Sequence, residues 1–480
     1  MTQAAPACAS LAALLRDLPD PLVIPDARQR IRAAHRVAGR RIAVLDDDPT
    51  GSQAVRGAMV LTSFSPADLS AGLADPGALC FLLTNSRSLA EPEAAALTGR
   101  VATGLADLER AAGISVEVVS RSDSTLRGHL RAEVTAMDAV TRQRTGRGYD
   151  GVLLIPAYFE AGRQTAGDIH WARVGGTDIP VGATEFARDP AFGYSSSDLR
   201  EFVAERYPGE LRPDEVRSIS LEDIRVGGPD RVRDLLMDVT DGMYVVVNAC
   251  GYADLEVVVL GLISARDEGR RFLYRCGPSF VRALAGTEPR PPLTSAEIAH
   301  STGHGLVVVG SHVGLTNRQL AAAWAGGGLA DVELDAAAVV DPATRERHVS
   351  DVTERVLAGL ARSDVLLTTS RALIAAQDRA DNLRVAATVS AALARAVRDA
   401  CAAATPAWIV AKGGITSHDI AVHGLGLRRA EVVGQLFPGM VSVFRPLDAD
   451  VRVGVYVVFA GNVGDDRALA DVVARLRGDR

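Results

Sequence analysis

Short runs of apolar residues recur along this chain, separated by helix-like sequence, and this alternation limits the folds that the chain can adopt. The first six runs are RRIAVLD (40–46), CFLLTNS (80–86), ISVEVVS (114–120), GVLLIPA (151–157), RSISL (217–221) and YVVVNA (244–249). They are continuous rather than alternating, as is typical of strands covered on both faces. Between them, segments such as 93–112 carry apolar residues at three- and four-residue spacing, which indicates amphipathic helices. The pattern predicts an α/β fold with a parallel or mixed sheet.

A proline-rich stretch, GTEPRPPLT (286–294), interrupts this alternation, because it can continue neither a helix nor a central strand. Beyond it the apolar runs resume as LVVVGS, VELD, DVLLTTS, WIVAKGG, MVSVFRP and VYVVFAGN, with a long helical pattern at 381–404. We therefore expect two α/β domains, residues 1–285 and 295–480, with a linker at 286–294 and the active site in the cleft between the domains. The stretch 158–197, rich in Gly, Pro and Asp, is expected to be an elaborated loop region of the first domain.

Composition excludes several classes of protein. The 480 residues are 48% hydrophobic, and their net charge of −7 argues against a nucleic-acid partner, so a small solute is the expected ligand. No apolar run reaches the roughly 18 residues of a membrane span, and the N-terminus lacks a basic leader, which predicts a soluble, cytoplasmic protein. The five cysteines are far apart and never spaced as C-x-x-C, so neither a disulfide framework nor a zinc site is expected. Assembly as a homodimer is left open.

Polar side chains follow several predicted strands of the first domain, where open α/β sheets assemble ligand sites. The residues that we expect to bind a ligand or to react there are Asp47, Asp48, Thr50, Asn85, Arg87, Asp123, Ser124, Arg127 and Arg163. Asp and Asn pair with hydroxyls, and a forked guanidinium pairs with a carboxylate, so the set predicts a polyhydroxylated anion such as a sugar acid. The alternatives are an acidic helix cap at 46–48 and a surface ion pair at Arg163.

Small residues follow three predicted strands of the second domain, an arrangement that exposes backbone N–H groups to phosphate oxygens. The candidate nucleotide-binding residues are Ser311, Lys412, Gly413, Gly414, Ile415, Thr416, Ser417, Gly461, Asn462 and Gly464. Lys412 is the only lysine of the chain, and its place beside two glycines is either a phosphate contact or a coincidence. The loops match neither the Walker A nor the G-x-G-x-x-G pattern. No metal is assigned to the nearby His312, His418 and His423, which lack Cys or acidic partners.

Taken in order, these motifs resemble those of the four-carbon acid sugar kinase family. The motifs are Asp47-Asp48-Pro49-Thr50-Gly51, Thr84-Asn85-Ser86-Arg87, Asp123-Ser124-Thr125-Leu126-Arg127-Gly128, Gly162-Arg163-Gln164-Thr165, Gly310-Ser311, Gly413-Gly414-Ile415-Thr416-Ser417 and Gly461-Asn462-Val463-Gly464. The resemblance implies a sugar-binding N-terminal domain, a nucleotide-binding C-terminal domain and ATP-dependent phosphorylation of threonate, erythronate or a 3-oxo-tetronate. The chain departs from many members at Arg121 and Ser122, at His312, and in an insert at 168–194, which bears on the identity of the substrate.

Phosphoryl transfer needs an aligned hydroxyl, a base and positive charge around the moving group. We expect Asp48, or Asp47 beside it, to accept the proton while Arg87, Arg127 and Arg163 hold the sugar acid. Backbone amides of the glycine loop, Lys412 and Mg²⁺ would neutralise the triphosphate of ATP. Because the two sites are predicted on different domains, a closing motion that excludes water is expected.

Two other functions remain open at this point. Asp46 and Asp48 match the D-x-D-x-T motif of haloacid-dehalogenase-type phosphohydrolases, but the lysine that those enzymes need near the nucleophile is absent from the first domain. The chain could also be a non-catalytic effector-binding protein, although no basic helix-turn-helix segment is present to carry an output. ADP formation that requires both ATP and an acceptor distinguishes a kinase from either alternative.

Overall fold

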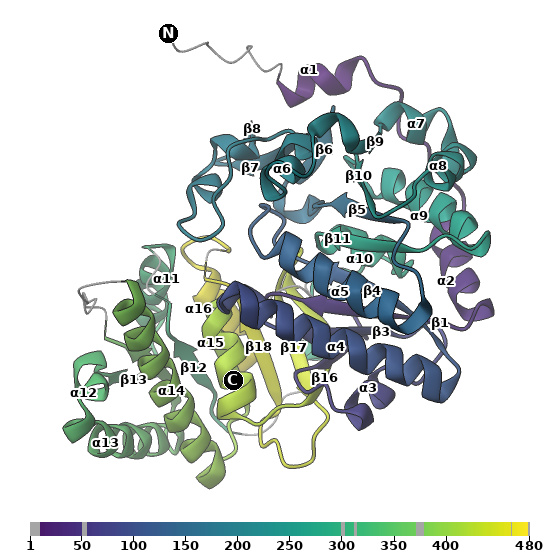
Figure 1. Cartoon of the computed structure of the whole chain (residues 1–480). Coiled ribbons are helices and arrows are strands. Elements are labelled where there is room, and N and C mark those ends of the chain that lie inside the picture. Colours follow the sequence, from purple (N-terminus) through teal and green to yellow (C-terminus); the bar gives the residue numbers. More distant parts are fainter. Residues whose placement is uncertain are drawn as a thin grey trace. The chain divides into compact units, whose positions relative to one another are not determined.

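The computed structural model describes residues 10–49, 55–298, 303–311, 314–370, 379–461 and 463–478 (Figure 1). The chain forms two compact units, an N-terminal unit of residues 1–47 and 64–289 and a C-terminal unit of residues 48–63 and 290–480. The sequence patterns do not indicate that residues 48–63 leave the N-terminal half. None of the helices in the described ranges is long and apolar enough to cross a membrane.

The N-terminal unit is built on a sheet whose strands all run parallel. Its strand order is β3 (Leu79–Leu83), β1 (Arg40–Asp46), β4 (Ser115–Arg121), β11 (Phe272–Cys276), β5 (Gly151–Ile155), β10 (Met243–Val247) and β9 (Arg217–Ile219). Nearly all residues of these strands are buried, as expected for a sheet covered on both faces. The parallel arrangement brings the carboxyl ends of the strands to one end of the sheet.

The helices of this unit precede, connect or follow its strands. They are α1 (Leu11–Arg16), α2 (Ala27–Val37), α3 (Pro66–Gly72), α4 (Glu91–Ala112), α5 (Leu130–Thr145), α6 (Leu199–Arg206), α7 (Leu221–Arg225), α8 (Gly228–Met237), α9 (Tyr252–Asp267) and α10 (Pro278–Leu284). In Figure 1, α4 and α5 lie side by side across the front of the sheet, and these two helices contact each other. The apolar helix α9 is buried on most sides because it packs against α2, α7, α8 and α10.

A separate three-stranded antiparallel sheet occupies the stretch expected to be loop. Its strands are β6 (Arg163–Ala166), β7 (Ile169–Val174) and β8 (Thr177–Pro180). Short 3₁₀ turns precede and follow this sheet at η3 (Phe159–Ala161), η4 (Val181–Ala183) and η5 (Glu185–Arg188). The stretch 158–197 therefore has its own secondary structure and can position side chains.

The C-terminal unit contains a mixed sheet. Its strand order is β13 (Leu329–Leu334), β14 (Asp364–Thr369), β12 (Leu306–Val309), β15 (Trp408–Lys412), β18 (Val455–Phe459), β17 (Met440–Pro446), β16 (Arg429–Phe437) and β2 (Met59–Leu61). The first five strands are parallel and the last three antiparallel. Its helices are α11 (Gly314–Ala325), α12 (Ala336–Val340), α13 (Pro342–Leu360), α14 (Arg379–Ala403), α15 (Gly414–Asp419) and α16 (Ala468–Arg477).

The predicted fold class, two α/β domains with parallel or mixed sheets, is confirmed. The apolar runs of the sequence form β1, β3, β4, β5, β9 and β10 in the N-terminal unit and β12, β13, β14, β15, β17 and β18 in the C-terminal unit. The sequence analysis missed β11, in which Arg275 breaks the apolar run, and it missed the hairpin sheet of β6 to β8.

Gly305 allows close packing at the start of β12. A Cβ atom at this position would lie 2.0 Å from Trp408 Cε2, inside the buried core of the C-terminal unit. We expect Gly305→Ala to lower the free energy of unfolding by about 1–3 kcal/mol, because overpacking must displace the indole ring. The control is Gly99→Ala in α4, where nothing lies within 4 Å of the added Cβ. Urea denaturation should show the control unchanged or slightly stabilised; equal midpoints for the two variants would contradict the prediction.

Candidate functional site

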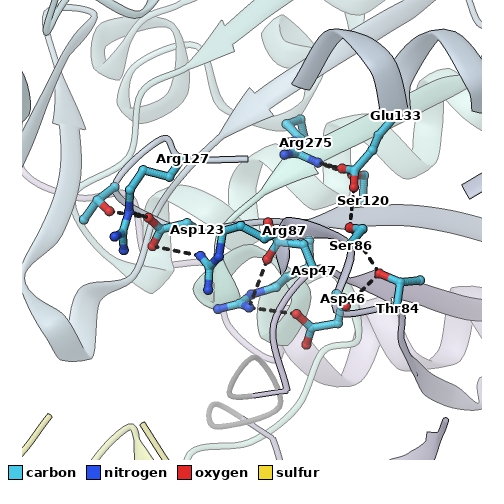
Figure 2. Close-up of polar contacts among 12 residues, drawn as sticks. Asp46, Asp47, Thr84, Ser86, Arg87, Ser120, Asp123, Arg127, Glu133 and Arg275 are labelled. Carbon is cyan, nitrogen blue, oxygen red and sulfur yellow. Dashed lines mark hydrogen bonds and ion pairs between the residues drawn. The ribbon is translucent and has the colours of Figure 1, made fainter. Parts of the chain in front are cut away.

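The carboxyl ends of β3, β1 and β4 are neighbours in the N-terminal unit. Asp46 at the end of β1 lies in register with Leu83 of β3 and with Arg121 of β4. The three polar clusters predicted from the sequence therefore meet at one end of the sheet, and Figure 2 shows their side chains side by side.

A buried ion pair fixes this end of β1. Arg121 Nη1 lies 2.7 Å from Asp46 Oδ1, and the two side chains are 6% and 0% exposed. Thr84 Oγ1, just after β3, donates to the backbone carbonyl of Asp46 at 2.9 Å. Because a buried pair is costly to separate, these contacts hold the three strand ends in one arrangement.

Asp47 follows directly and lies in a different environment. Its side chain is 3% exposed, and neither carboxylate oxygen has a hydrogen-bond partner among the described residues; Arg121 Nη1 stays 3.8 Å from Oδ1. Burial raises the pKa of Asp47 to about 6, although the positive charges of Arg87, Arg121 and Arg275 act in the opposite direction. A carboxylate with a pKa near neutrality and unused acceptor oxygens is suited to receiving a proton.

A glycine lets the backbone approach this carboxylate closely. Gly128 has φ of 124°, and a Cβ there would lie 3.0 Å from Asp47 Oδ2 and 2.8 Å from Arg275 Nη2. Arg275 in turn is bound by Glu133 and donates to Ser120 Oγ at 2.7 Å. No other residue type fits at position 128 without displacing charged groups of the site.

Asp123, on the loop after β4, contacts two arginines, Arg127 on the same loop and Arg87 after β3. Arg127 Nε donates to Asp123 Oδ2 at 2.6 Å, and Arg87 Nη1 lies 3.8 Å from Oδ1. Burial disfavours the charged form, but the two guanidinium groups outweigh it and hold the pKa of Asp123 well below its usual range. Figure 2 shows Arg87 lying between Asp123 and Asp47. Asp123 is therefore ionised across the neutral pH range.

The insert contributes an aromatic ring to the same group. Phe186 of η5 lies under two guanidinium groups, 5.2 Å from Arg127 Cζ and 5.8 Å from Arg163 Cζ, and Asp189 lies 3.6 Å from Arg127. Arg163 Nε is buried and has no hydrogen-bond partner among the described residues. A cation over an aromatic face keeps its N–H edges available for another acceptor.

The hairpin sheet also holds the loop that carries Asp123. His170 Nε2 donates to the carbonyl of Ser124 at 2.8 Å, its Nδ1 accepts from Thr165 Oγ1 at 2.9 Å, and Tyr194 donates to the carbonyl of Thr125 at 2.8 Å. Burial lowers the pKa of His170 to about 4, so the ring is neutral at pH 7. Leu126 in this loop has φ of 71°, an unfavourable conformation that such contacts maintain.

In the C-terminal unit, small residues gather after the adjacent strands β12, β15 and β18. A Cβ on Gly413 would lie 3.1 Å from Thr416 Oγ1 and 3.3 Å from Ser311 Cβ, and a Cβ on Gly461 would lie 2.9 Å from Ser311 Oγ. Gly413 has φ of 116°, which favours glycine. The arrangement leaves backbone, rather than bulky side chains, at these strand ends, as phosphate-binding loops require.

Lys412 is buried, and its amine contacts Ala460, the residue directly before Gly461. The Lys412 side chain is 0% exposed; Nζ donates to the carbonyl of Ala460 at 3.1 Å and lies 3.7 Å from the centre of the Phe459 ring. Burial lowers the pKa of Lys412 to about 7. Ser417 is likewise turned inward, because its hydroxyl donates to the carbonyl of Ala411 at 2.8 Å.

Asp48 lies beside the glycine loop within the C-terminal unit. Its Oδ2 is 3.2 Å from the position that a Cβ on Gly414 would occupy. Its negative charge also acts on His418 in α15, whose pKa is lowered mainly by burial. Asp47 and Asp48 are consecutive residues, yet the first belongs to the N-terminal unit and the second to the C-terminal unit.

Two family models match this chain. Residues 42–284 match a sugar-binding N-terminal domain, and residues 306–469 match a nucleotide-binding C-terminal domain. The matches define a protein with one domain for a sugar and one for a nucleotide. The chain belongs to the four-carbon acid sugar kinase family, which has this two-domain architecture.

Solved structures share the fold. A Salmonella typhimurium LT2 protein, labelled as a proposed tRNA synthase, is 18% identical with a TM-score of 0.66, over 90% of this chain and 98% of its own. A Haemophilus influenzae protein of the DUF1537 family is 17% identical with a TM-score of 0.59, over 90% of this chain and 99% of its own. At these identities the likeness concerns the fold alone. No curated protein matches the sequence.

The structure groups the predicted residues into two sets. The N-terminal set comprises Asp47, Asn85, Arg87, Asp123, Ser124, Arg127 and Arg163, and the C-terminal set comprises Asp48, Ser311, Gly413, Gly414, Ile415, Thr416, Gly461 and Gly464. Lys412 and Ser417 face the interior, Ile415 is 57% exposed, and Thr50 and Asn462 lie outside the described residues. The sequence analysis missed Arg275, Phe186, Asp189, His170 and Tyr194 as parts of the site; the unusual composition of the insert was the one available signal.

The buried amine of Lys412 should make stability depend on pH. The folded state releases this proton near pH 7 and the unfolded state near 10.5, so raising the pH between these values favours folding of the wild type. Lys412→Met removes this effect. We therefore expect the stability advantage of the variant over the wild type to shrink between pH 7 and 10, by up to about 1.4 kcal/mol per pH unit. Urea denaturation at several pH values measures it, and parallel curves for the two proteins would contradict it.

Proposed function

We propose that this protein is an ATP-dependent kinase that phosphorylates the terminal hydroxyl of a four-carbon sugar acid of the threonate, erythronate or 3-oxo-tetronate type. The observation that carries the proposal is the group of Arg87, Arg127 and Arg163 around Asp123, beside the buried carboxylate of Asp47. This group lies in the half of the chain that matches a sugar-binding domain, and the other half matches a nucleotide-binding domain.

The N-terminal site has the chemistry to recognise a sugar acid. Guanidinium groups of Arg127 and Arg163, spread on the Phe186 ring, suit the two oxygens of a carboxylate. The ionised Asp123 can accept hydrogen bonds from sugar hydroxyls, as can Asn85 through its side-chain oxygen. The ligand would thus be held by its acid group and its hydroxyls together, which fits a short polyhydroxylated acid.

Asp47 is the proton acceptor that we propose. The hydroxyl oxygen of the substrate forms a bond to the γ-phosphorus of ATP, the bond from that phosphorus to the β–γ bridging oxygen breaks, and ADP leaves. The hydroxyl proton passes to the Asp47 carboxylate, whose oxygens have no other hydrogen-bond partner among the described residues. Its pKa of about 6 leaves it ionised at pH 7 and basic enough to take up a proton.

The glycine loops of the C-terminal unit would hold ATP. Ser311, Gly413, Thr416 and Gly461 lie together after three parallel strands, and close approach of backbone to phosphate requires such small residues. Lys412, buried beneath the loop, would act through its charge rather than through direct contact. Ile415 offers an exposed apolar surface beside the loop.

Mg²⁺ fits the same place through one carboxylate. The described residues contain no group of three or more His, Cys, Asp or Glu side chains that could hold a metal. Kinase Mg²⁺ ions are usually held by one or two carboxylates together with the phosphates of the nucleotide, and the Asp48 carboxylate lies beside Gly414. Bound there, Mg²⁺ would neutralise charge on the triphosphate.

The structure offers less support for the two alternatives. A phosphohydrolase would need Asp46 as part of its reactive pair, but this side chain is completely buried and bound to Arg121. A binding protein without catalysis would not need a carboxylate with a raised pKa, since an unpaired buried acid costs stability.

A coupled assay of ADP release tests the proposed reaction. We expect ADP to form only when ATP, Mg²⁺ and a four-carbon sugar acid are all present, and the rate to saturate with the acid. Five- and six-carbon sugar acids at equal ionic strength serve as comparisons. An unchanged ADP baseline across threonates, erythronates and their oxo derivatives would refute the proposal.

The role of Asp47 is tested by Asp47→Asn. We expect kcat to fall by about 10²–10⁴, the range of general-base catalysis, with little change in nucleotide affinity. In the wild type, kcat/KM should fall below pH 6 as this carboxylate becomes protonated. Thermal stability at pH 7 should not fall, because the variant removes a buried charge.

The matched control is Asp214→Asn, which removes an exposed carboxylate from the same unit. It should leave both kcat and the pH profile unchanged. Full activity of Asp47→Asn would exclude Asp47 as the base without affecting the ADP-release result.

A further inference from the structure

A charged depression lies at the end of the N-terminal sheet opposite the candidate site, where the strands begin. It measures about 410 Å³ and is lined by five arginines, a serine and a glycine: Arg40, Arg147, Arg266, Arg270, Arg271, Ser115 and Gly269. Arg40 starts β1, Ser115 starts β4, and Arg271 immediately precedes β11. No carboxylate side chain is among these lining residues.

Arg40 has a buried nitrogen that is not satisfied. The residue is 7% exposed, and Nη2 forms an ion pair with Asp267. Nη1 is buried and has no hydrogen-bond partner among the described residues. Buried polar groups are nearly always hydrogen-bonded, so an unsatisfied charged donor beside a depression indicates a missing acceptor.

Arg266 lies close enough to Arg40 for the two charges to oppose each other. Arg266 is held by Glu117, burial lowers its pKa, and the charge of Arg40 acts in the same direction. Two like charges in a poorly solvated place repel each other even when each has its own carboxylate partner, and a further anion beside them would reduce this repulsion.

The remaining arginines are bound mainly by neutral groups. Arg147 Nη2 donates to the carbonyl of Gly269 at 2.6 Å, and Arg271 Nη1 donates to Thr145 Oγ1 at 2.7 Å. Asp150 lies 3.5 Å from both Arg147 and Arg270. Only three carboxylates, Asp150, Asp267 and Glu117, form ion pairs with the five lining arginines in the described part of the chain. The depression is therefore positively charged.

We propose that this depression is a second ligand site, which binds a small anion carrying phosphate groups. Forked guanidinium groups match phosphate oxygens, and several of them together favour more than one negative charge. The volume falls within the range of small-molecule sites, about 300–1,000 Å³. The site is separate from the candidate sugar-acid site, because Arg40 and Asp46 lie at opposite ends of β1, roughly 20 Å apart.

Hydrogen exchange on the whole protein tests this, with inorganic pyrophosphate as the probe. Pyrophosphate should slow hydrogen exchange in residues 264–272 and 145–150. Protection of the glycine loops of the C-terminal unit, where pyrophosphate could bind in place of ATP phosphates, is scored separately. The dissociation constant comes from the protection of 264–272 as pyrophosphate is titrated. Succinate at the same ionic strength is the comparison anion, because it carries charge without phosphate geometry.

The double variant Arg147→Gln/Arg271→Gln should weaken pyrophosphate binding about tenfold or more and retain the fold, since both side chains are partly exposed. Arg40→Gln should weaken it as well. Arg212→Gln, an exposed arginine paired with Asp214 on its own turn, should bind as the wild type does. The proposal is overturned by unchanged exchange at 264–272, by equal protection from succinate, or by equal affinity of the double variant and Arg212→Gln.

Discussion

The ion pair between Asp46 and Arg121 is the interaction on which the rest of the N-terminal site depends. The ion pair is buried and joins the ends of β1 and β4. It thereby holds Asp47, which follows Asp46, among the positive charges of Arg87, Arg121 and Arg275. A buried pair adds little net stability, because desolvation offsets the attraction. The ion pair matters here for geometry, because it fixes the Asp46 carboxylate on Arg121. The carboxylate oxygens of the adjacent Asp47 have no hydrogen-bond partner among the described residues.

Under the proposed function, the two units would bind their ligands by different physical means. In the N-terminal unit, charged side chains carry the site, and a shell of further contacts from Glu133, His170 and Tyr194 supports them. In the C-terminal unit, small residues and backbone form the loop, and the one lysine lies beneath it. Side-chain charges discriminate between acids, whereas backbone amides suit the phosphates that all nucleotides share.

Sequence patterns predicted the α/β fold class and the polar or small residues that follow particular strands, because apolar runs and the residues after them are local features. They missed β11, since Arg275 is charged and its partner Glu133 is distant in the sequence. They also missed the hairpin sheet and the Phe186 ring, whose contacts with Arg127 and Arg163 arise only in the folded chain. The burial of Lys412 could not be predicted either, because composition identifies a rare residue but not the environment of its side chain.

The route of the chain between the units has a consequence for dissecting this protein. Residues 48–63 leave the N-terminal half, and their strand β2 completes the C-terminal sheet by pairing with β16. A gene cut within 286–294 would produce a C-terminal fragment lacking this strand, with the backbone of β16 open to pairing with other chains. The two halves are thus expected to be inherited, expressed and purified as one piece, even though each has its own core.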